Sequence, residues 1–163
     1  MSKAVIAGYV RSPFHFAGKG ALTKVRPDDL AATVVKGLIQ KTGVKPDDIE
    51  DLILGCAFPE GEQGLNVARL IGLIAGLPQS VAGATLNRFC GSSMQGIHMA
   101  AGAIAMGAGQ AFICAGQTMT LLSLPRDQSM ASFSMRLKAS RRMYTLCASR
   151  RSRWFMTSRS SGL

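Results

Sequence analysis

The sequence has few acidic residues, few aromatic residues and no recognisable metal-binding pattern. It contains 9 Asp and Glu against 19 Lys and Arg, and aromatic residues make up 6% of its 163 positions. Its four cysteines, Cys56, Cys90, Cys114 and Cys147, form no CxxC pair. Neither a disulfide framework nor a zinc site is therefore expected. Reduced thiols of this kind are typical of a cytosol-like compartment, so we expect a cytoplasmic protein.

Long hydrophobic runs are also missing. The apolar stretch from Ala4 to Val10 runs directly into Arg11 without the small-residue cleavage site of a secretory leader. Residues 99–116 have the length of a membrane span, but Ala and Gly dominate them and Gln110 interrupts them. No GxGxxG motif follows a candidate strand. We expect no membrane association and no nicotinamide or flavin.

The net charge of +10 is concentrated in the last part of the chain. Up to Gly116 there are ten basic against eight acidic residues, whereas from Gln117 onward nine basic residues face the single Asp127. No sustained period of 2 or 3.6 continues beyond about Thr120. We predict a domain over residues 1–119 and an irregular Arg- and Ser-rich tail over 120–163, for which an out-of-frame reading is one hypothesis. A basic irregular tail needs no partner, so nucleic acid is not the expected ligand.

Before about Thr120, segments with the apolar pattern of a strand alternate with segments that have the apolar pattern of a helix. A length of 163 residues with 47% hydrophobic residues suits one ordinary domain. Strands are predicted at residues 4–10, 52–56, 81–87 and 111–115, and helices at residues 27–43, 66–75 and 92–106. Alternating strands and helices predict a layered α/β fold with parallel connections.

The most chemically informative segment is Asn87-Arg88-Phe89-Cys90-Gly91, which joins the third strand to the third helix. A cysteine at a helix amino terminus is favoured as the reactive thiolate by the helix dipole and by free backbone N–H groups. We expect Gly91 to allow a tight turn and close approach of a substrate, and Ser92 with Gln95 to form a capping box. A buried, unreactive cysteine is about equally consistent with these residues alone.

The segment Asn87–Gln95 resembles the active-site signature of the thiolase family, and three further segments follow in that family's order. They are Arg11-Ser-Pro-Phe14, Gly64-Leu-Asn-Val-Ala-Arg69 and Ala115-Gly-Gln-Thr-Met119. The resemblance spans about Lys3 to Met119. It implies the amino-terminal portion of a layered thiolase fold, with most of one of the two similar halves that such subunits contain.

By this resemblance Cys90 is the catalytic nucleophile, which takes the acyl group of an acyl-CoA as a thioester. That group is then passed to an acetyl-CoA carbanion, or it arises in reverse when a 3-ketoacyl-CoA is cleaved with CoA. The backbone N–H of Cys90 is implied in an oxyanion hole. The resemblance also implies acyl-CoA and CoA as substrates, no permanently bound cofactor and a homo-oligomer for the full-length family.

Other family residues have no counterpart here. The family's acid/base cysteine, activating histidine and second oxyanion-hole glycine lie in its carboxyl-terminal half, and neither His15 nor His98 has the expected sequence context. His98 follows Cys90 by about two helical turns, but an ordinary polar helix residue is favoured over a catalytic one. Asn66 and Arg69 are interpreted as supports of the active-site loop and of a subunit contact.

Two functions therefore remain open. The first is a thiolase-type acyltransferase that we expect to be inactive as an isolated chain. The second, the alternative, is a non-catalytic fragment, which could include a binding module that uses its basic tail.

Overall fold

The computed structural model describes residues 3–13, 15, 20–117 and 143–149, and in the last range it describes the backbone. The main elements are β1 (Ala4–Arg11), α1 (Pro27–Thr42), β2 (Asp51–Cys56), α2 (Val67–Ile74), β3 (Ala82–Leu86), α3 (Ser92–Met106), β4 (Ala111–Gln117) and β5 (Met143–Ser149). Three short 3-10 turns, η1 (Pro46–Asp48), η2 (Gly61–Gln63) and η3 (Phe89–Gly91), lie between them. The predicted strands and helices up to residue 117 are all present.

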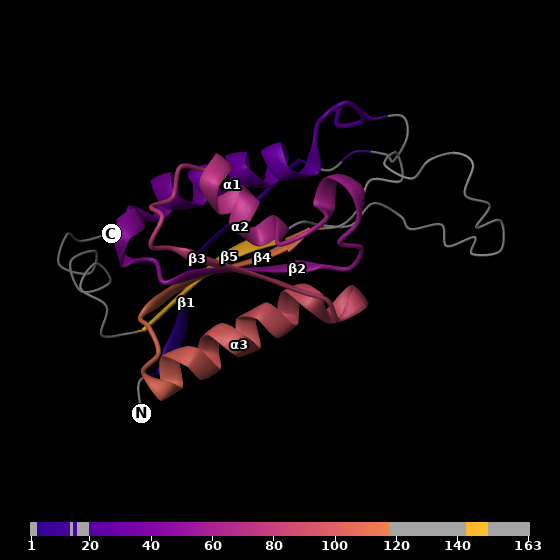
Figure 1. Ribbon diagram of the computed structural model, residues 1–163. Coiled ribbons are helices and arrows are strands. Elements are labelled where there is room, and N and C mark those ends of the chain that lie inside the picture. The colour runs from indigo at the N-terminus through magenta and orange to yellow at the C-terminus, as the bar shows by residue number, and fades with distance from the viewer. Residues whose placement is uncertain (1–2, 14, 16–19, 118–142, 150–163) are drawn as a thin grey trace.

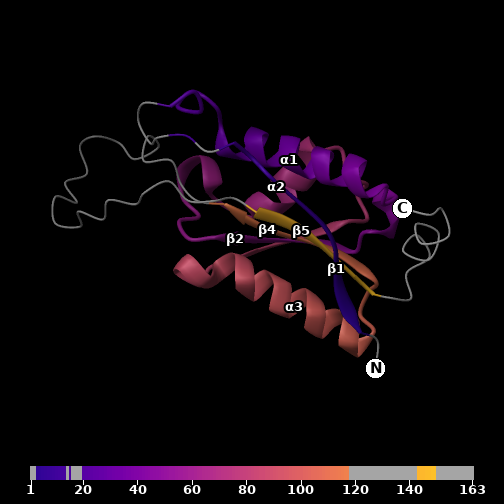
Figure 2. The ribbon, with the colours of Figure 1, turned by 180° about the vertical axis from the view of Figure 1, so that it is seen from behind.

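A single five-stranded sheet, in the order β1-β5-β4-β2-β3, organises these elements. Strand β2 pairs in parallel with both β3 and β4, as the alternating pattern predicts. Helices α1 and α2 cover one face of the sheet and α3 covers the other, which both views show (Figures 1 and 2). The α/β prediction is confirmed.

Strand β5 differs from the prediction of irregular structure after Thr120. It lies between β1 and β4 and pairs antiparallel with both of them. The physical reason is that the pairing partners of residues 143–149 lie far away in the sequence, so a local period does not reveal them. The rest of the predicted tail lies outside the described residues, and the domain boundary at residue 119 stays a prediction.

The core has two compartments because alternate residues of the central strands face opposite sides of the sheet. Leu52, Leu54 and Ile113 belong to the cluster under α1 and α2, whereas Ile53 and Phe112 belong to the cluster over α3. Strand β2 is buried on both faces, as is typical of a parallel strand between two helical layers. Among the described helices, none is long and apolar enough to cross a membrane.

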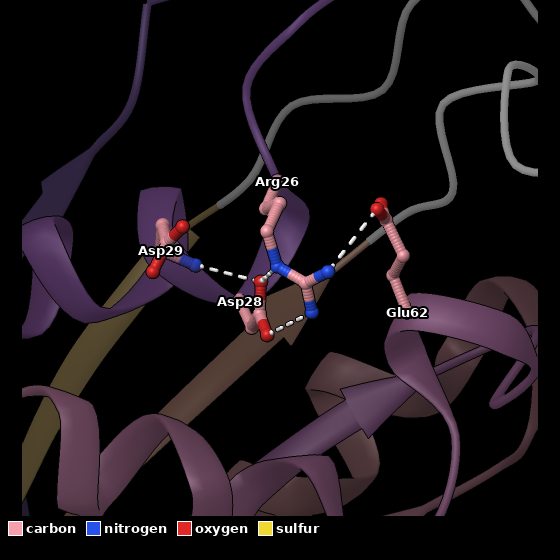
Figure 3. Close-up of polar contacts among 4 residues, drawn as sticks. All are labelled: Arg26, Asp28, Asp29 and Glu62. Carbon is pink, nitrogen blue, oxygen red and sulfur yellow. Dashed lines mark hydrogen bonds and ion pairs between the residues drawn. The ribbon is translucent and has the colours of Figure 1, made fainter.

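The start of α1 is tied to the loop after β2 by an ion-pair cluster (Figure 3). The Arg26 guanidinium donates to both carboxylate oxygens of Asp28, at 3.1 and 2.8 Å, and to Glu62 of η2 at 3.3 Å. The Asp29 backbone N–H donates to Asp28 at 3.0 Å. Burial alone would raise the pKa of Asp28, but these hydrogen bonds and the Arg26 charge outweigh it and lower that pKa. The buried carboxylate therefore stabilises the fold in its ionised form.

We predict that Asp28→Asn lowers the melting temperature at neutral pH by about 2–4 °C, the shift expected for a loss of roughly 1 kcal/mol in a chain of this size. Because the folded pKa of Asp28 is lowered, its stabilisation exists above the unfolded pKa and disappears as the pH falls through the folded value. The difference between the two proteins should therefore vanish at strongly acidic pH. Thermal unfolding followed by circular dichroism between pH 2 and 7 measures it, and a constant difference over that range would contradict the prediction.

Asp51, at the start of β2, has the opposite electrostatic effect. One of its carboxylate oxygens is buried and makes no hydrogen bond within the part of the chain that the structure describes. Burial raises its pKa, and an N–H bond from Leu52 only partly offsets that rise. The folded state therefore favours the protonated form of Asp51, and ionisation of this side chain opposes folding.

Asp51→Asn is expected to keep or raise stability at pH 7, by up to about 1 kcal/mol. Since the folded pKa of Asp51 is raised, wild-type stability is retained below the unfolded pKa and falls as the pH rises through the folded one. Urea unfolding at pH 4 and pH 7 should show the advantage of the variant only at the higher pH. A variant that is less stable than wild type at pH 7 would refute this account of Asp51.

Candidate active site at Cys90

Cys90 lies in the turn that connects β3 to α3. The chain leaves β3 at Leu86, passes through η3 and enters α3 at Ser92. Strands β2, β3 and β4 run in parallel, so their carboxyl ends meet at the edge of the sheet where this turn begins. The Cys90 residue is exposed, whereas Cys56 and Cys114 are buried. The predicted strand–turn–helix placement of Cys90 is confirmed, and the turn is open to solvent.

Asn87 ties the first half of this turn to the neighbouring loop. Its Nδ2 donates to the carbonyl of Ala57, directly after β2, at 3.0 Å. Its Oδ1 accepts the backbone N–H of Phe89 at 2.8 Å. A single side chain thus fixes the turn locally and attaches it to the end of the adjacent strand.

The second half of the turn depends on Ser92 rather than on the predicted capping box. Ser92 is the first residue of α3, the N-cap is Gly91, and no side chain caps the helix. The Ser92 hydroxyl accepts the N–H of Arg88 at 2.8 Å and donates to the carbonyl of Phe89 at 2.6 Å. Gln95 accepts a hydrogen bond from the Arg88 guanidinium. The capping-box prediction is wrong because Ser92 lies inside the helix, where its hydroxyl reaches back into the preceding turn.

The backbone N–H groups around Cys90 differ in their partners. Those of Arg88 and Phe89 donate to side-chain oxygens, and those of Gly91 and Ser92 donate to backbone carbonyls. The Cys90 N–H makes no hydrogen bond with any residue of the described ranges. It is a donor beside an exposed thiol, which is the arrangement needed to bind an oxygen of a bound acyl group.

The left-handed backbone position in this turn is Phe89, not the glycine. Phe89 has φ 47°, whereas Gly91 has φ −91°, which most residues adopt. The tight turn therefore does not depend on a positive φ at Gly91. A Cβ placed on Gly91 would meet no atom of the described residues within 4 Å, so this part of the chain leaves space open next to Cys90.

Two glycines of the sheet allow the first turn of α3 to approach it closely. Gly55 of β2 and Gly116 of β4 are direct partners in the parallel ladder. A Cβ on Gly55 would lie 2.5 Å from the backbone of Ser92 and Ser93, and one on Gly116 would lie 2.6 Å from the Ser93 Cβ. This glycine seat, Gly55 with Gly116, sets the position of the helix start that follows Cys90.

Asn66 and Arg69 support β3, the strand that leads to Cys90. Asn66 caps α2, donates to Gly83 at 2.7 Å and accepts from the Thr85 hydroxyl at 2.9 Å. The Arg69 guanidinium donates to the carbonyl of Val81. These contacts hold the β3 segment and do not reach the turn at Cys90, so the predicted support of the active-site loop stays a prediction. The predicted subunit contact stays a prediction.

The other candidate residues do not join this site. His98 is exposed on α3, and His15 is exposed in the loop after β1. Cys147 pairs through its backbone with Phe112 inside the sheet. No group of three or more His, Cys, Asp or Glu side chains that could hold a metal occurs in the described part of the chain.

Sequence reasoning missed the glycine seat and the bond from Asn87 to Ala57. A glycine inside a candidate strand is a signal of close approach by another backbone, so Gly55 could have been singled out, whereas Gly116 lies just beyond the predicted strand at residues 111–115. The partner of Asn87 lies 30 residues away and has no comparable local signal.

Fold and site together define an α/β protein with an exposed cysteine in a turn between a parallel strand and a helix. The family described as "Thiolase, N-terminal domain" matches residues 4–150. The chain belongs to the thiolase family. That match extends beyond the segment ending at Met119 and includes β5.

Curated relatives agree with this family assignment. A 3-ketoacyl-CoA thiolase of Bacillus subtilis (strain 168) is 49% identical over 116 residues, which cover 71% of this chain and 30% of the relative. A 3-ketoacyl-CoA thiolase of Psychrobacter cryohalolentis is 45% identical over 112 residues, which cover 69% of this chain and 29% of that relative. The chain thus spans about 30% of the length of the curated relatives it matches.

We predict that Gly55→Ala destabilises the chain by about 1–3 kcal/mol, because its new methyl group overlaps backbone atoms at the start of α3. Gly91→Ala is the matched control, since the same substitution meets open space there at an ordinary φ. Urea unfolding of both variants measures the difference. Equal stability of the two would show that the glycine seat does not constrain the helix.

Proposed function

We propose that this chain carries the acyl-accepting part of a thiolase-type acyltransferase, with Cys90 as the nucleophile. The observation that carries the proposal is an exposed Cys90 whose own backbone N–H, just before α3, has no hydrogen-bond partner among the described residues. Membership of the thiolase family and the names of the relatives support CoA thioesters as the substrate class.

The proposed acylation begins with attack of the Cys90 thiolate on the acyl carbonyl carbon of an acyl-CoA. A new sulfur–carbon bond forms, the carbonyl oxygen becomes negatively charged, and the Cys90 N–H donates to that oxygen. Collapse of this intermediate breaks the bond to the CoA sulfur, and the departing CoA thiolate takes up a proton. The acyl group remains on Cys90 as a thioester.

In the degradative direction the same thiolate attacks the 3-keto carbon of a 3-ketoacyl-CoA. The carbon–carbon bond to the acetyl-CoA part breaks, and the resulting carbanion is protonated. CoA then attacks the Cys90 thioester and releases a shortened acyl-CoA. Condensation with acetyl-CoA is the reverse of these steps, so one nucleophile serves both directions.

The proposal covers formation of the Cys90 thioester and not complete turnover by the isolated chain. The match to relatives covers about 30% of their length, and the proton-transfer groups implied by the family resemblance have no counterpart near Cys90 among the described residues. We therefore propose that transfer of the acyl group from Cys90 to an acceptor needs groups beyond the described residues of this chain. A cytoplasmic location and a homo-oligomeric assembly belong to the same proposal.

Incubation of the purified chain with acetyl-CoA is expected to add a single acetyl group to Cys90. Intact-protein mass spectrometry measures the adduct, and peptide mapping locates it. Cys90→Ser is the control and should show no thioester, because its hydroxyl lacks the acidity and nucleophilicity of a thiol. Absence of any adduct on the folded chain, or an adduct that survives in Cys90→Ser, would overturn the proposal.

A further inference from the structure

The hydroxyl of Ser92 is placed so that it controls the Cys90 turn without being accessible itself. Ser92 is 3% exposed, whereas Cys90, two residues earlier, is exposed. The hydroxyl accepts the Arg88 N–H and donates to the Phe89 carbonyl at 2.8 and 2.6 Å. Its two bonds therefore reach backbone groups on the amino-terminal side of Cys90, and the turn is closed around the cysteine.

One of these hydrogen bonds is made to Phe89, the residue of the turn with a strained backbone conformation. Phe89 is a bulky residue in the left-handed region, with φ 47°, which costs about 1 kcal/mol or more and persists only where surrounding contacts enforce it. The Ser92 hydroxyl holds the Phe89 carbonyl, and Asn87 holds the Phe89 N–H. The peptide groups on both sides of the strained residue are thus fixed by side chains.

The bonds of Ser92 also determine which backbone donor stays unengaged. The Arg88 N–H donates to the Ser92 hydroxyl, and the Phe89 N–H donates to the Asn87 side chain. The Cys90 N–H is then the donor of the turn that has no partner among the described residues. Loss of the hydroxyl would leave the Arg88 N–H unpaired as well as the Cys90 N–H. It would also remove one restraint on the peptide plane that precedes Cys90.

The effect of the Ser92 hydroxyl on the turn can be tested separately from the packing of the Ser92 backbone and Cβ. The Ser92 backbone and Cβ fill the space left by Gly55, with a Cβ on that glycine coming within 2.8 Å of the Ser92 Cβ. An alanine at position 92 would keep that packing and lose only the oxygen. The role of the hydroxyl is therefore testable independently of the contact between helix and sheet.

We propose that Ser92 is a positioning residue for Cys90, whose hydroxyl fixes the direction of the Cys90 N–H relative to the Cys90 thiol. This inference rests on the proposed function, in which those two groups act on one acyl carbonyl. Ser92 does not contact the acyl group. It acts by holding the turn in the conformation that presents both groups together.

The test compares Ser92→Ala with Ser93→Ala. Ser93 is the next residue of the same helical turn, and its hydroxyl makes no hydrogen bond within the described residues, so it is a matched control. Two rates are measured on the full chain, acetylation of Cys90 by acetyl-CoA and alkylation of Cys90 by iodoacetamide, which needs the thiol but no oriented N–H.

Ser92→Ala is expected to slow acetylation about tenfold or more, because misplacement of a reacting group by a fraction of an ångström has effects of this size. Alkylation should change by less than about threefold, the effect of a single weak hydrogen bond. Ser93→Ala should retain both wild-type rates. Wild-type acetylation by Ser92→Ala, or an equal fall in both of its rates, would overturn the role of Ser92.

Amide hydrogen exchange separates this inference from the proposed function. In the wild-type chain the Arg88 amide should exchange at least tenfold more slowly than the Cys90 amide, and Ser92→Ala should remove that difference. If the wild-type chain is not acetylated but this exchange pattern is found, the proposed function fails and the positioning of the turn stands. Equal exchange of the two amides in the wild-type chain overturns the inference, and this measurement does not depend on whether the variant folds.

Discussion

The close approach of α3 to the sheet is the constraint on which the rest of the site depends. Gly55 and Gly116 face each other across β2 and β4, and a side chain on either would overlap the first turn of the helix. Because the helix start is held there, the turn between β3 and α3 has to be short and tightly bent. Within that turn Phe89 takes a left-handed backbone conformation and Cys90 is exposed.

Polar side chains then convert this bent turn into a defined arrangement of donors. Asn87 attaches it to the loop after β2, and Ser92 closes it from within the helix. The same loop is connected to the start of α1 through the bond between Arg26 and Glu62. Elements that are distant in the sequence thereby hold the surroundings of Cys90, although the contacts nearest to it are made by residues within five positions of it.

Much of the fold follows from local patterning. The strand at residues 51–56 was predictable as a short apolar run bounded by turn residues, and the structure buries it on both faces. The helix at residues 92–106 was predictable from the length of its run of small and apolar residues, and it buries every fourth residue, from Ser92 to Ile104. Strand β5 was not predictable, because residues 143–149 acquire their strand conformation by pairing with β1 and β4. The sequence also did not reveal that Phe89 rather than Gly91 takes the positive φ, because a glycine at a turn permits that conformation without requiring it.

The sequence by itself determined the thiolase family, the strand–turn–helix order and the position of Cys90 within it, because these are properties of contiguous residues. Only the tertiary structure decided that Gly55 and Gly116 together admit the helix, that the Ser92 hydroxyl turns back toward Phe89, and that the Cys90 N–H has no partner among the described residues. Those features depend on distances between strands and helices and on the competition of neighbouring groups for each donor, neither of which is encoded in a local motif.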